Sequence, residues 1–503
     1  MLIATFSLCL FILPSVTNVF AANTQINDID TLISRTMQRQ NVPGVSVAVL
    51  NEGEVTFHSQ GYVCLENSIK IKEDTFFYIA SLTKAFTALG IQWLDFEKKL
   101  SIDDPVSFHI PWINFSYRAS DFSVDELTIR HLLNHTSGLG DFTHSATIPF
   151  QYRSDALYQS VQAINSTRLR RRPGVGFEYA SINYILLGFL IQEVYSKTYE
   201  EKSYEEFMLS RILHPLGLYN TKMSRQAALD SGVLVQGYRP SWFRSRPYSV
   251  YVNNSHTPTG FMISNAMDLS KWLEFHINPQ NAPKPFDILI PKSHVPDTTV
   301  PAVEIDTGFY YYGFGWHISQ NDDFDRVRHA GFLSNFVSEA LFYQEEELGV
   351  IVLMNSSSGY AGNLADNIIA ITRGEEAGHI AFGFMMKNMD TIFSAISLFS
   401  IGVVLGLLVI FVLEVIKNKK NKIIYKNPSI RGRIFIGFIV TSIVLLTLIP
   451  AVFPFALNIT WATAVMWIPH SAYTLYVFST LVFLSVGLII LLRILYPRKN
   501  KKK

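Results

Sequence analysis

Ser81 and Lys84 stand one helical turn apart in the run Ser81-Leu82-Thr83-Lys84. At the start of a helix this spacing places the hydroxyl and the amine on the same face. The amine can then take the proton of the hydroxyl, which turns a weak nucleophile into a strong one. Lys84 must be neutral for that step, a state that burial and nearby positive charge favour. The pattern by itself is expected by chance in most chains of this length, so it gains meaning only if other motifs of the same chemistry accompany it.

Two further motifs follow in order. Phe177-Glu178-Tyr179-Ala180-Ser181-Ile182-Asn183-Tyr184 is centred on a tyrosine, and His329-Ala330-Gly331 comes later in the same region. A tyrosine can transfer protons, and a glycine on a strand permits close approach of another backbone. Other chemistries lack their motifs, because the chain has no Gly-x-Ser-x-Gly elbow and no His-Glu-x-x-His pair. No metal and no cofactor is therefore expected.

Strands near both ends of residues 23–375, with helices between them, are expected to position these groups. The expected strands are 45–50, 55–58, 311–316, 337–342 and 350–354. Apolar residues at helical spacing over 85–96 predict a helix that leads away from Ser81, and a helix from about 363 to 372 closes the region. This order predicts an α/β fold, in which an antiparallel sheet built from both ends carries a helical subdomain. Ser81 would lie at the junction.

The last third of the chain is expected to be a membrane domain, residues 392–496, joined by a linker at 376–391. Three apolar runs are each long enough to cross about 30 Å of hydrocarbon: 392–413, 434–457 and 470–492. Lys and Arg gather in the loop after the first run and in the tail 497–503, which the positive-inside rule places in the cytoplasm. The three helices would anchor the protein or, alternatively, guide an acylated substrate towards the site.

The N-terminus predicts export. Residues 1–21 combine an apolar run with Val19-Phe20-Ala21, a small-residue cleavage site. An uncleaved anchor is the alternative, and it exports the next segment as well. Signal and charge bias together predict a multi-pass protein of a bacterial cell membrane, with residues 23–375 on the extracytoplasmic side and lipid as a partner. Cys64 is the only cysteine beyond the signal, so no intrachain disulfide is expected. The net charge of +1 gives no indication of nucleic acid binding.

The three motifs in this order resemble the serine β-lactamase and penicillin-binding-protein superfamily, over roughly residues 25–375. Landmarks at Val42-Pro43-Gly44, 128–139 and 213–218 are similar to the class C β-lactamase and DD-peptidase branch. The resemblance implies a β-lactamase-like sheet flanked by helices. It also implies that Ser81 is the nucleophile, that Lys84 accepts its proton and that Tyr179 relays the proton to the leaving amine. The backbone N–H groups of Ser81 and Phe332 would form the oxyanion hole.

Two positions depart from the usual pattern of the superfamily. His329 stands where many relatives have lysine, on the strand that with Gly331 would border the cleft. Ser181 stands where penicillin-processing relatives usually have asparagine. A serine there, together with a C-terminal membrane unit, resembles a narrower group of membrane-anchored peptidases, such as the colibactin, xenocoumacin and zwittermicin activators. These enzymes remove an N-acyl-D-asparagine cap from an exported nonribosomal peptide prodrug.

The asparagine-recognising positions of that group fall on Ser181, His256 and Asn335. A hydroxyl, an imidazole and an amide together satisfy the donors and acceptors of a primary amide. With His329 and Gly331 they form the expected substrate-binding set for an N-acylated peptide. A D-alanyl-D-alanine carboxypeptidase or β-lactamase-like cell-wall enzyme is the alternative, as is a non-catalytic penicillin-binding-like sensor. The oligomeric state is left open.

Overall fold

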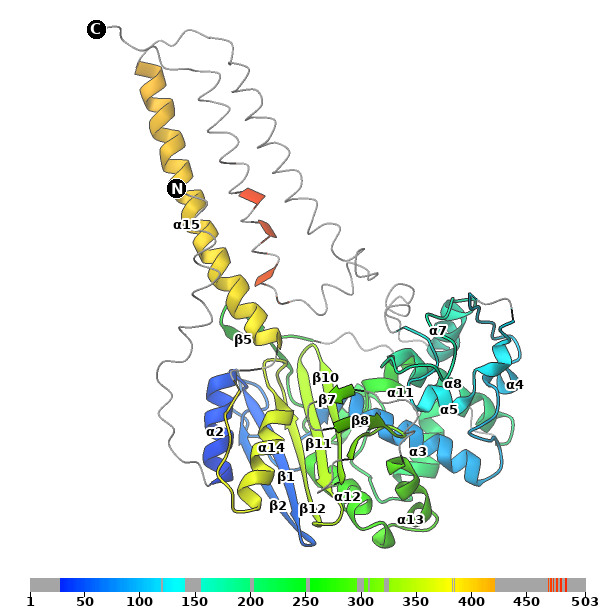
Figure 1. Cartoon of the computed structure of the whole chain (residues 1–503). Coiled ribbons are helices and arrows are strands. Elements are labelled where there is room, and N and C mark those ends of the chain that lie inside the picture. Colours follow the sequence, from blue (N-terminus) through cyan, green and yellow to red (C-terminus); the bar gives the residue numbers. More distant parts are fainter. Residues whose placement is uncertain are drawn as a thin grey trace.

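The computed structural model describes residues 28–118, 121–140, 155–199, 203–249, 254–295, 303–305, 308–320, 325–381, 383, 385–420 and single positions between 469 and 485. Within these residues a folded domain carries one long helix, α15, that extends away from it (Figure 1). The expected signal, residues 1–21, and the second apolar run, 434–457, lie outside the described residues. The third run, 470–492, is described only at single positions.

An antiparallel sheet forms the centre of the domain. In the described residues it has eight strands in the order β2-β1-β12-β11-β10-β9-β8-β7. Their bounds are β1 Gly44–Asn51, β2 Glu54–Gly61, β7 Val303–Ile305, β8 Gly308–Tyr312, β9 His317–Gln320, β10 Asp325–Leu333, β11 Phe336–Tyr343 and β12 Leu348–Met354. The first strand lies beside the last, with Val47 opposite Val352. Both ends of the domain therefore meet in one sheet, as the sequence predicts.

The single strand expected over 311–316 is wrong. β8 ends at Tyr312 and β9 begins at His317, so the chain turns back between them. Gly315 has φ +84°, and a Cβ there would lie 2.5 Å from Ala85 Cα. A glycine is required because the turn needs a positive φ and packs directly on the helix behind Ser81.

Helices cover both faces of the sheet, which explains why its central strands are apolar throughout. Along β1, Val45, Val47 and Val49 pack in the core beneath α2 (Ile29–Gln40) and α14 (Ala361–Thr372). Ala48 and Leu50 point to the opposite core, because successive side chains of a strand alternate between faces.

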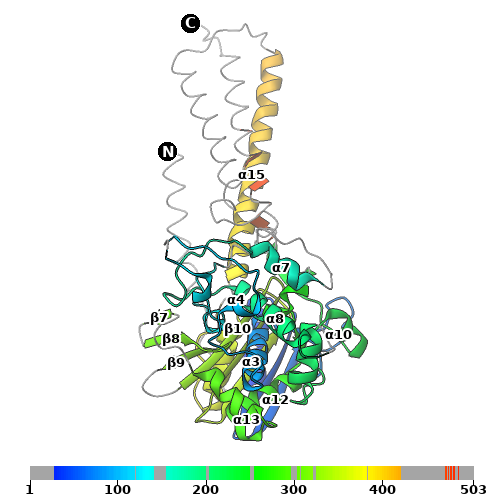
Figure 2. The ribbon, with the colours of Figure 1, turned by 90° about the vertical axis from the view of Figure 1, so that its right-hand side faces the viewer.

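The second core belongs to the helical part of the domain, and Figure 2 looks onto it with α3 and α8 in front of the sheet. Its helices are α3 Thr83–Phe96, α4 Val106–His109, α5 Ile129–Leu133, α7 Ala156–Ile164, α8 Ser181–Ser196, α9 Tyr204–Phe207, α10 Arg225–Ser231, α11 Thr257–Gly260, α12 Ala266–Ile277 and α13 Phe286–Leu289. Two small two-stranded sheets add β3 Phe77–Tyr78 with β6 Ile263–Ser264, and the hairpin of β4 Tyr238–Ser241 with β5 Arg244–Pro247.

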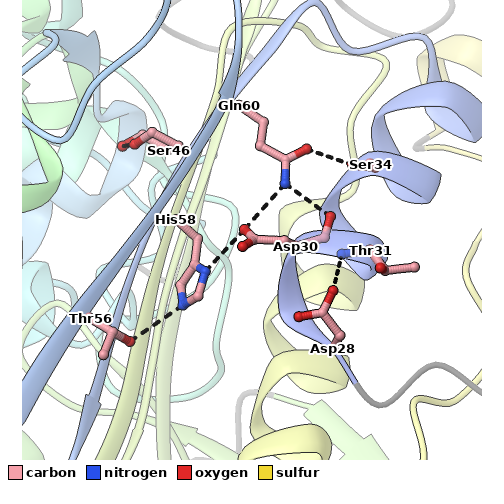
Figure 3. Close-up of polar contacts among 9 residues, drawn as sticks. Asp28, Asp30, Thr31, Ser34, Ser46, Thr56, His58 and Gln60 are labelled. Carbon is pink, nitrogen blue, oxygen red and sulfur yellow. Dashed lines mark hydrogen bonds and ion pairs between the residues drawn. The ribbon is translucent and has the colours of Figure 1, made fainter.

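Polar contacts join α2 to the edge strand β2 (Figure 3). Asp28 caps α2 by accepting a hydrogen bond of 2.8 Å from Thr31 N. Asp30 accepts from the Gln60 amide through its backbone oxygen at 2.9 Å, and its carboxylate lies 3.1 Å from His58 Nδ1. These contacts fasten α2 to the end strand of the sheet.

α15 runs from Met385 to Lys420, and its stretch Lys387–Gly406 has the length and apolar composition of a membrane span. It overlaps the first expected span, 392–413. In the part of the chain that the structure describes, this is the one such helix.

Candidate active site

Ser81 and Lys84 lie together at the start of α3. Ser81 belongs to a 3₁₀ turn, Ala80–Leu82, that leads directly into the helix at Thr83. Ser81 Oγ and Lys84 Nζ are 3.1 Å apart, and the Lys84 side chain is fully buried. Ser81 is partly exposed, so its hydroxyl can be reached from outside while the amine stays shielded.

A second contact holds the Lys84 amine. Lys84 Nζ donates a hydrogen bond of 2.8 Å to the backbone oxygen of Thr259 in α11. The hydroxyl of Thr87, one turn further along α3, donates to the oxygen of Pro258 at 2.7 Å. Two bonds between α3 and α11 thus fix the amine beside Ser81. A neutral amine held in this way has a lone pair for the serine proton.

The backbone before Ser81 is held tightly. Ala80 adopts φ +49°, a conformation that is uncommon for residues with a Cβ. Ser338 Oγ of β11 donates to Ile79 O at 2.7 Å, and a Cβ on Gly331 would lie 2.6 Å from the same oxygen. Gly331 therefore lets β10 pass close to the nucleophile turn. The role of Gly331 in binding substrate stays a prediction.

Tyr179 lies just before α8 and close to the amine. Lys84 Nζ is 5.0 Å from the centre of the Tyr179 ring. The buried His135 holds this segment, since its Nδ1 accepts from Ala180 N at 3.2 Å and from the Asn183 amide at 3.0 Å. His135 and Tyr179 rings are 4.4 Å apart. His135 thus joins the segment after α5 to the segment that carries the tyrosine.

His329 belongs to the corner, the group of side chains around Lys84 Nζ, and both of its ring nitrogens form hydrogen bonds. Its Nδ1 lies 2.8 Å from Ala330 O, so Nδ1 carries the proton and donates. Nε2 must then accept from the Tyr312 hydroxyl at 3.0 Å. His329 is 1% exposed. Its place among the substrate-binding residues stays a prediction, and this geometry favours a positioning role for it.

The imidazoles around the corner are neutral. Burial is the largest cause that holds the pKa of His329 well below its usual value, and burial does the same to the pKa of His135. Burial and Arg328 lower the pKa of His317 to about 4. A histidine at position 329 therefore cannot supply the positive charge that lysine brings to many relatives.

The oxyanion pair predicted from the sequence comes from two neighbouring elements. Ser81 lies in the 3₁₀ turn. Phe332 lies on β10, where it is opposite Val337 of β11, and β10 packs against that turn. Gly331, the residue before Phe332, makes this close packing feasible. The role of the two N–H groups stays a prediction.

The three expected amide-recognising residues come from distant segments. Ser181 is the first residue of α8, two positions after Tyr179. His256 O accepts from the Thr259 hydroxyl at 2.9 Å, and burial together with the nearby Lys84 lowers the pKa of His256 to about 4. His256 is thereby tied to the segment that holds the Lys84 amine.

Asn335 lies on the turn between β10 and β11 and is 2% exposed. Its Nδ2 donates to Tyr248 O at 2.8 Å. Its Oδ1 is buried and has no hydrogen-bond partner among the described residues. A buried amide oxygen without a donor is uncommon in native structures.

The contacts of three residues of the corner could not be predicted from sequence motifs. Thr259 contributes only its backbone oxygen, which no side-chain pattern reveals. Tyr312 is one of several tyrosines in a strand, and only the fold shows that it pairs with His329. His135 lies within a family landmark, so the sequence marked its position, although not its contact with the tyrosine segment.

Comparisons with known proteins agree with this architecture. The β-lactamase family model matches residues 29–372. Protein flp of Staphylococcus aureus is 30% identical over 352 residues, which cover 69% of this chain and 66% of that protein. An Aspergillus campestris protein named unguisins hydrolase ungD' is 24% identical and is covered to 63%. The chain thus spans just under two thirds of the length of these relatives.

Solved structures share the fold. The octameric penicillin-binding protein homologue from Pyrococcus abyssi has a TM-score of 0.58 at 24% identity and covers 69% of this chain and 77% of its own. A class C β-lactamase has a TM-score of 0.57 at 18% identity, and the match covers 70% of this chain and 96% of the β-lactamase. The family model spans most of the chain, including all three motifs. The chain belongs to the β-lactamase-like family of serine hydrolases.

Proposed function

We propose that the chain is a serine peptidase that works through an acyl-enzyme on Ser81. The observation that carries the proposal is the position of the buried Lys84 amine, 3.1 Å from Ser81 Oγ and 2.8 Å from Thr259 O. The carbonyl oxygen fixes the position of the amine beside Ser81 Oγ. A serine that is to attack an amide needs such a base within hydrogen-bond reach.

In the proposed reaction Ser81 Oγ attacks the substrate carbonyl carbon and its proton passes to Lys84 Nζ. The backbone N–H groups of Ser81 and Phe332 stabilise the oxyanion. The C–N bond then breaks, and Tyr179 delivers a proton to the leaving amine while Lys84 returns one to Tyr179. Water hydrolyses the ester by the reverse route and releases the acid and free Ser81.

For the substrate we propose an N-acyl-D-Asn cap on a nonribosomal peptide prodrug. Ser181, His256 and Asn335 would bind the primary amide of the asparagine. Support comes from the buried Asn335 Oδ1, which has no partner among the described residues, and from His256, an imidazole near Lys84 that its lowered pKa keeps neutral. A primary amide offers two donors and one acceptor, so it matches groups of this kind.

We also propose that the enzyme is exported and anchored in a bacterial cell membrane, with its catalytic domain on the extracytoplasmic side. The helix α15 supports this location through the length and apolar composition of Lys387–Gly406. The basic residues at the C-terminal end of the helix, among them Lys417, Lys419 and Lys420, support the orientation. An acylated substrate would reach such an enzyme from the bilayer.

The test compares kcat/KM for N-acyl-D-Asn, N-acyl-L-Asn and D-Ala-D-Ala peptides on the detergent-solubilised enzyme. We expect D-Asn to exceed its D-Ala analogue by about 10⁴, because the methyl group leaves buried polar groups unpaired. Faster cleavage of D-Ala-D-Ala peptides would instead identify a cell-wall carboxypeptidase.

A fluorophosphonate label supplies the control for the chemistry. Labelling that requires Ser81, with equal rates on the D-Asn and D-Ala substrates, would refute the prodrug role and leave the serine mechanism intact. A protein that binds these peptides without labelling or turnover would be a sensor.

A further inference from the structure

The tip of the β4–β5 hairpin carries two aromatic residues whose types do not suit its backbone conformation. Ser241 pairs with Arg244, which leaves Trp242 and Phe243 as a two-residue loop with φ +54° and +63°. Loops with positive φ at both positions strongly prefer Asn-Gly or Asp-Gly. Two bulky aromatic residues are strained there. Their presence points to a use for the side chains outside the hairpin.

The hairpin tip is fastened to α15. The Asp390 carboxylate accepts from Trp242 N at 3.1 Å and from Phe243 N at 3.0 Å, and Asp390 is 1% exposed. From the other side the Asn41 amide donates to Phe243 O at 3.1 Å. Asp390 lies three residues into the candidate span Lys387–Gly406. Figure 1 shows β5 beside this first part of α15. The tip is therefore held at the level where the apolar stretch begins.

The surface of the tip combines aromatic and basic side chains. Phe243 is 42% exposed, and Arg244 and Arg246 are both exposed. Residues 231–267 contain three arginines and no Asp or Glu, so this part of the chain has a net positive charge. Exposed apolar residues continue from the same level along α15, among them Ile392 and Ile396. Aromatic rings and arginines beside the end of an apolar helix are the composition of a membrane–water interface.

We propose that the β4–β5 hairpin is a membrane-contacting element. Trp242 and Phe243 enter the interface of the bilayer, and Arg244 and Arg246 bind the phosphates of anionic phospholipids. The proposal rests on the membrane location proposed above. It adds a second contact to α15, so the catalytic domain cannot rotate freely about a single helix.

This contact lies next to the proposed substrate pocket. Tyr238 N, at the start of β4, donates to Asn335 O at 3.3 Å. Asn335 Nδ2 donates to Tyr248 O, just beyond β5. The two strands of the hairpin thus flank the Asn335 turn. A hairpin seated on the bilayer would keep this pocket close to the surface from which an acyl chain arrives.

The test uses the full chain in nanodiscs of phosphatidylcholine with and without phosphatidylglycerol. A nitroxide is attached to Phe243→Cys in a Cys9→Ser/Cys64→Ser background, and the matched control is Phe108→Cys on α4, where the native residue is 72% exposed. Fluorophosphonate labelling of Ser81 checks the fold of each variant. We expect the label at 243 to be accessible to oxygen and protected from an aqueous nickel chelate, and the label at 108 to show the reverse. Equal chelate accessibility at both sites would overturn the proposal.

The arginines are tested by Arg244→Ala/Arg246→Ala, with Arg168→Ala/Arg225→Ala as a control pair of exposed arginines. We expect the first pair to raise chelate accessibility at 243 severalfold in discs with phosphatidylglycerol, and the second pair to leave it unchanged. An identical effect of both pairs would refute the role of Arg244 and Arg246. Release of the protein from membranes by alkaline carbonate would overturn the membrane location itself, and the hairpin contact with it. Retention with an aqueous hairpin would overturn only the contact.

Discussion

Lys84 with its neighbour His329 and the turn around Asn335 differ in how far their polar side-chain atoms are paired, although the buried His135 Nε2 near Lys84 also has no hydrogen-bond partner among the described residues. Lys84 Nζ contacts both Ser81 Oγ and Thr259 O, and His329 uses both ring nitrogens. The side chain of Asn335 forms a hydrogen bond only through Nδ2, and its Oδ1 is buried without a partner among the described residues. An unpaired buried acceptor costs about 1–3 kcal/mol. A ligand that donates to it recovers part of that free energy.

The difference suggests a division of labour. The proposed catalytic groups would be arranged before substrate arrives, which is where electrostatic catalysis gains most. The proposed pocket would be completed only by substrate. Changes in the first region should therefore abolish turnover, whereas changes in the second should alter the choice of substrate.

The largest effect is expected for Ser81→Ala. The hydroxyl carries the covalent step, so its loss should lower kcat by at least about 10⁴ and abolish fluorophosphonate labelling. Ser107→Ala, a partly exposed serine on α4, is the matched control. Activity within tenfold of the wild type would exclude Ser81 as the nucleophile.

Lys84→Ala and Tyr179→Phe should each lower kcat nearly as far as Ser81→Ala. The double variant should lose little more than either single one, because groups that act as one unit are not additive. A kinetic cycle of the three proteins measures this. Additive losses would place the two side chains in independent roles.

Asn335→Ala should reduce the preference for D-Asn over D-Ala substrates by about tenfold to a hundredfold. The expected change is a fall in kcat/KM for D-Asn with little change for D-Ala, since only the former uses the amide pocket. Ser334→Ala, at the neighbouring buried position, is the control. Unchanged selectivity would remove Asn335 from the pocket.

His135 tests whether the tyrosine segment needs to be held. His135→Asn keeps an acceptor near the position of Nδ1, whereas His135→Gln moves it towards the position of Nε2. We expect kcat to stay within about threefold for the first and to fall about tenfold or more for the second, because Ala180 N and the Asn183 amide lose their acceptor. Equal kcat values, with equal losses of Tm, would indicate a purely structural role.

The smallest effect concerns pH. His256 and His317 have pKa values lowered to about 4 in the folded state, against an ordinary value of 6.5. Between these pH values the unfolded chain binds more protons, so stability should fall as pH decreases from about 6.5 to about 4. Tm by near-UV circular dichroism measures the slope, and His317→Gln should flatten it. A slope that His317→Gln leaves unchanged would contradict the assignment.

Several features follow from the sequence because they are local. The spacing of Ser81 and Lys84 places them on one helix face, and the apolar strands at 44–51 and 348–354 follow from composition. The antiparallel sheet was predicted from the order of strands and helices, and the family from the order of the three motifs. Local rules fail at 311–316, since only packing against Ala85 explains the turn at Gly315.

Other features were decided by the tertiary structure. The carbonyl that holds Lys84 lies 175 residues further along the chain, and a backbone oxygen has no signature in sequence. The neutral state of His329 depends on burial among groups from three segments, which lowers its pKa. The hairpin tip joins Asp390 to residues 147 and 148 positions earlier in the chain. Spacing along a helix determines which side chains are neighbours on that helix, whereas contacts between distant segments exist only once the whole core has packed.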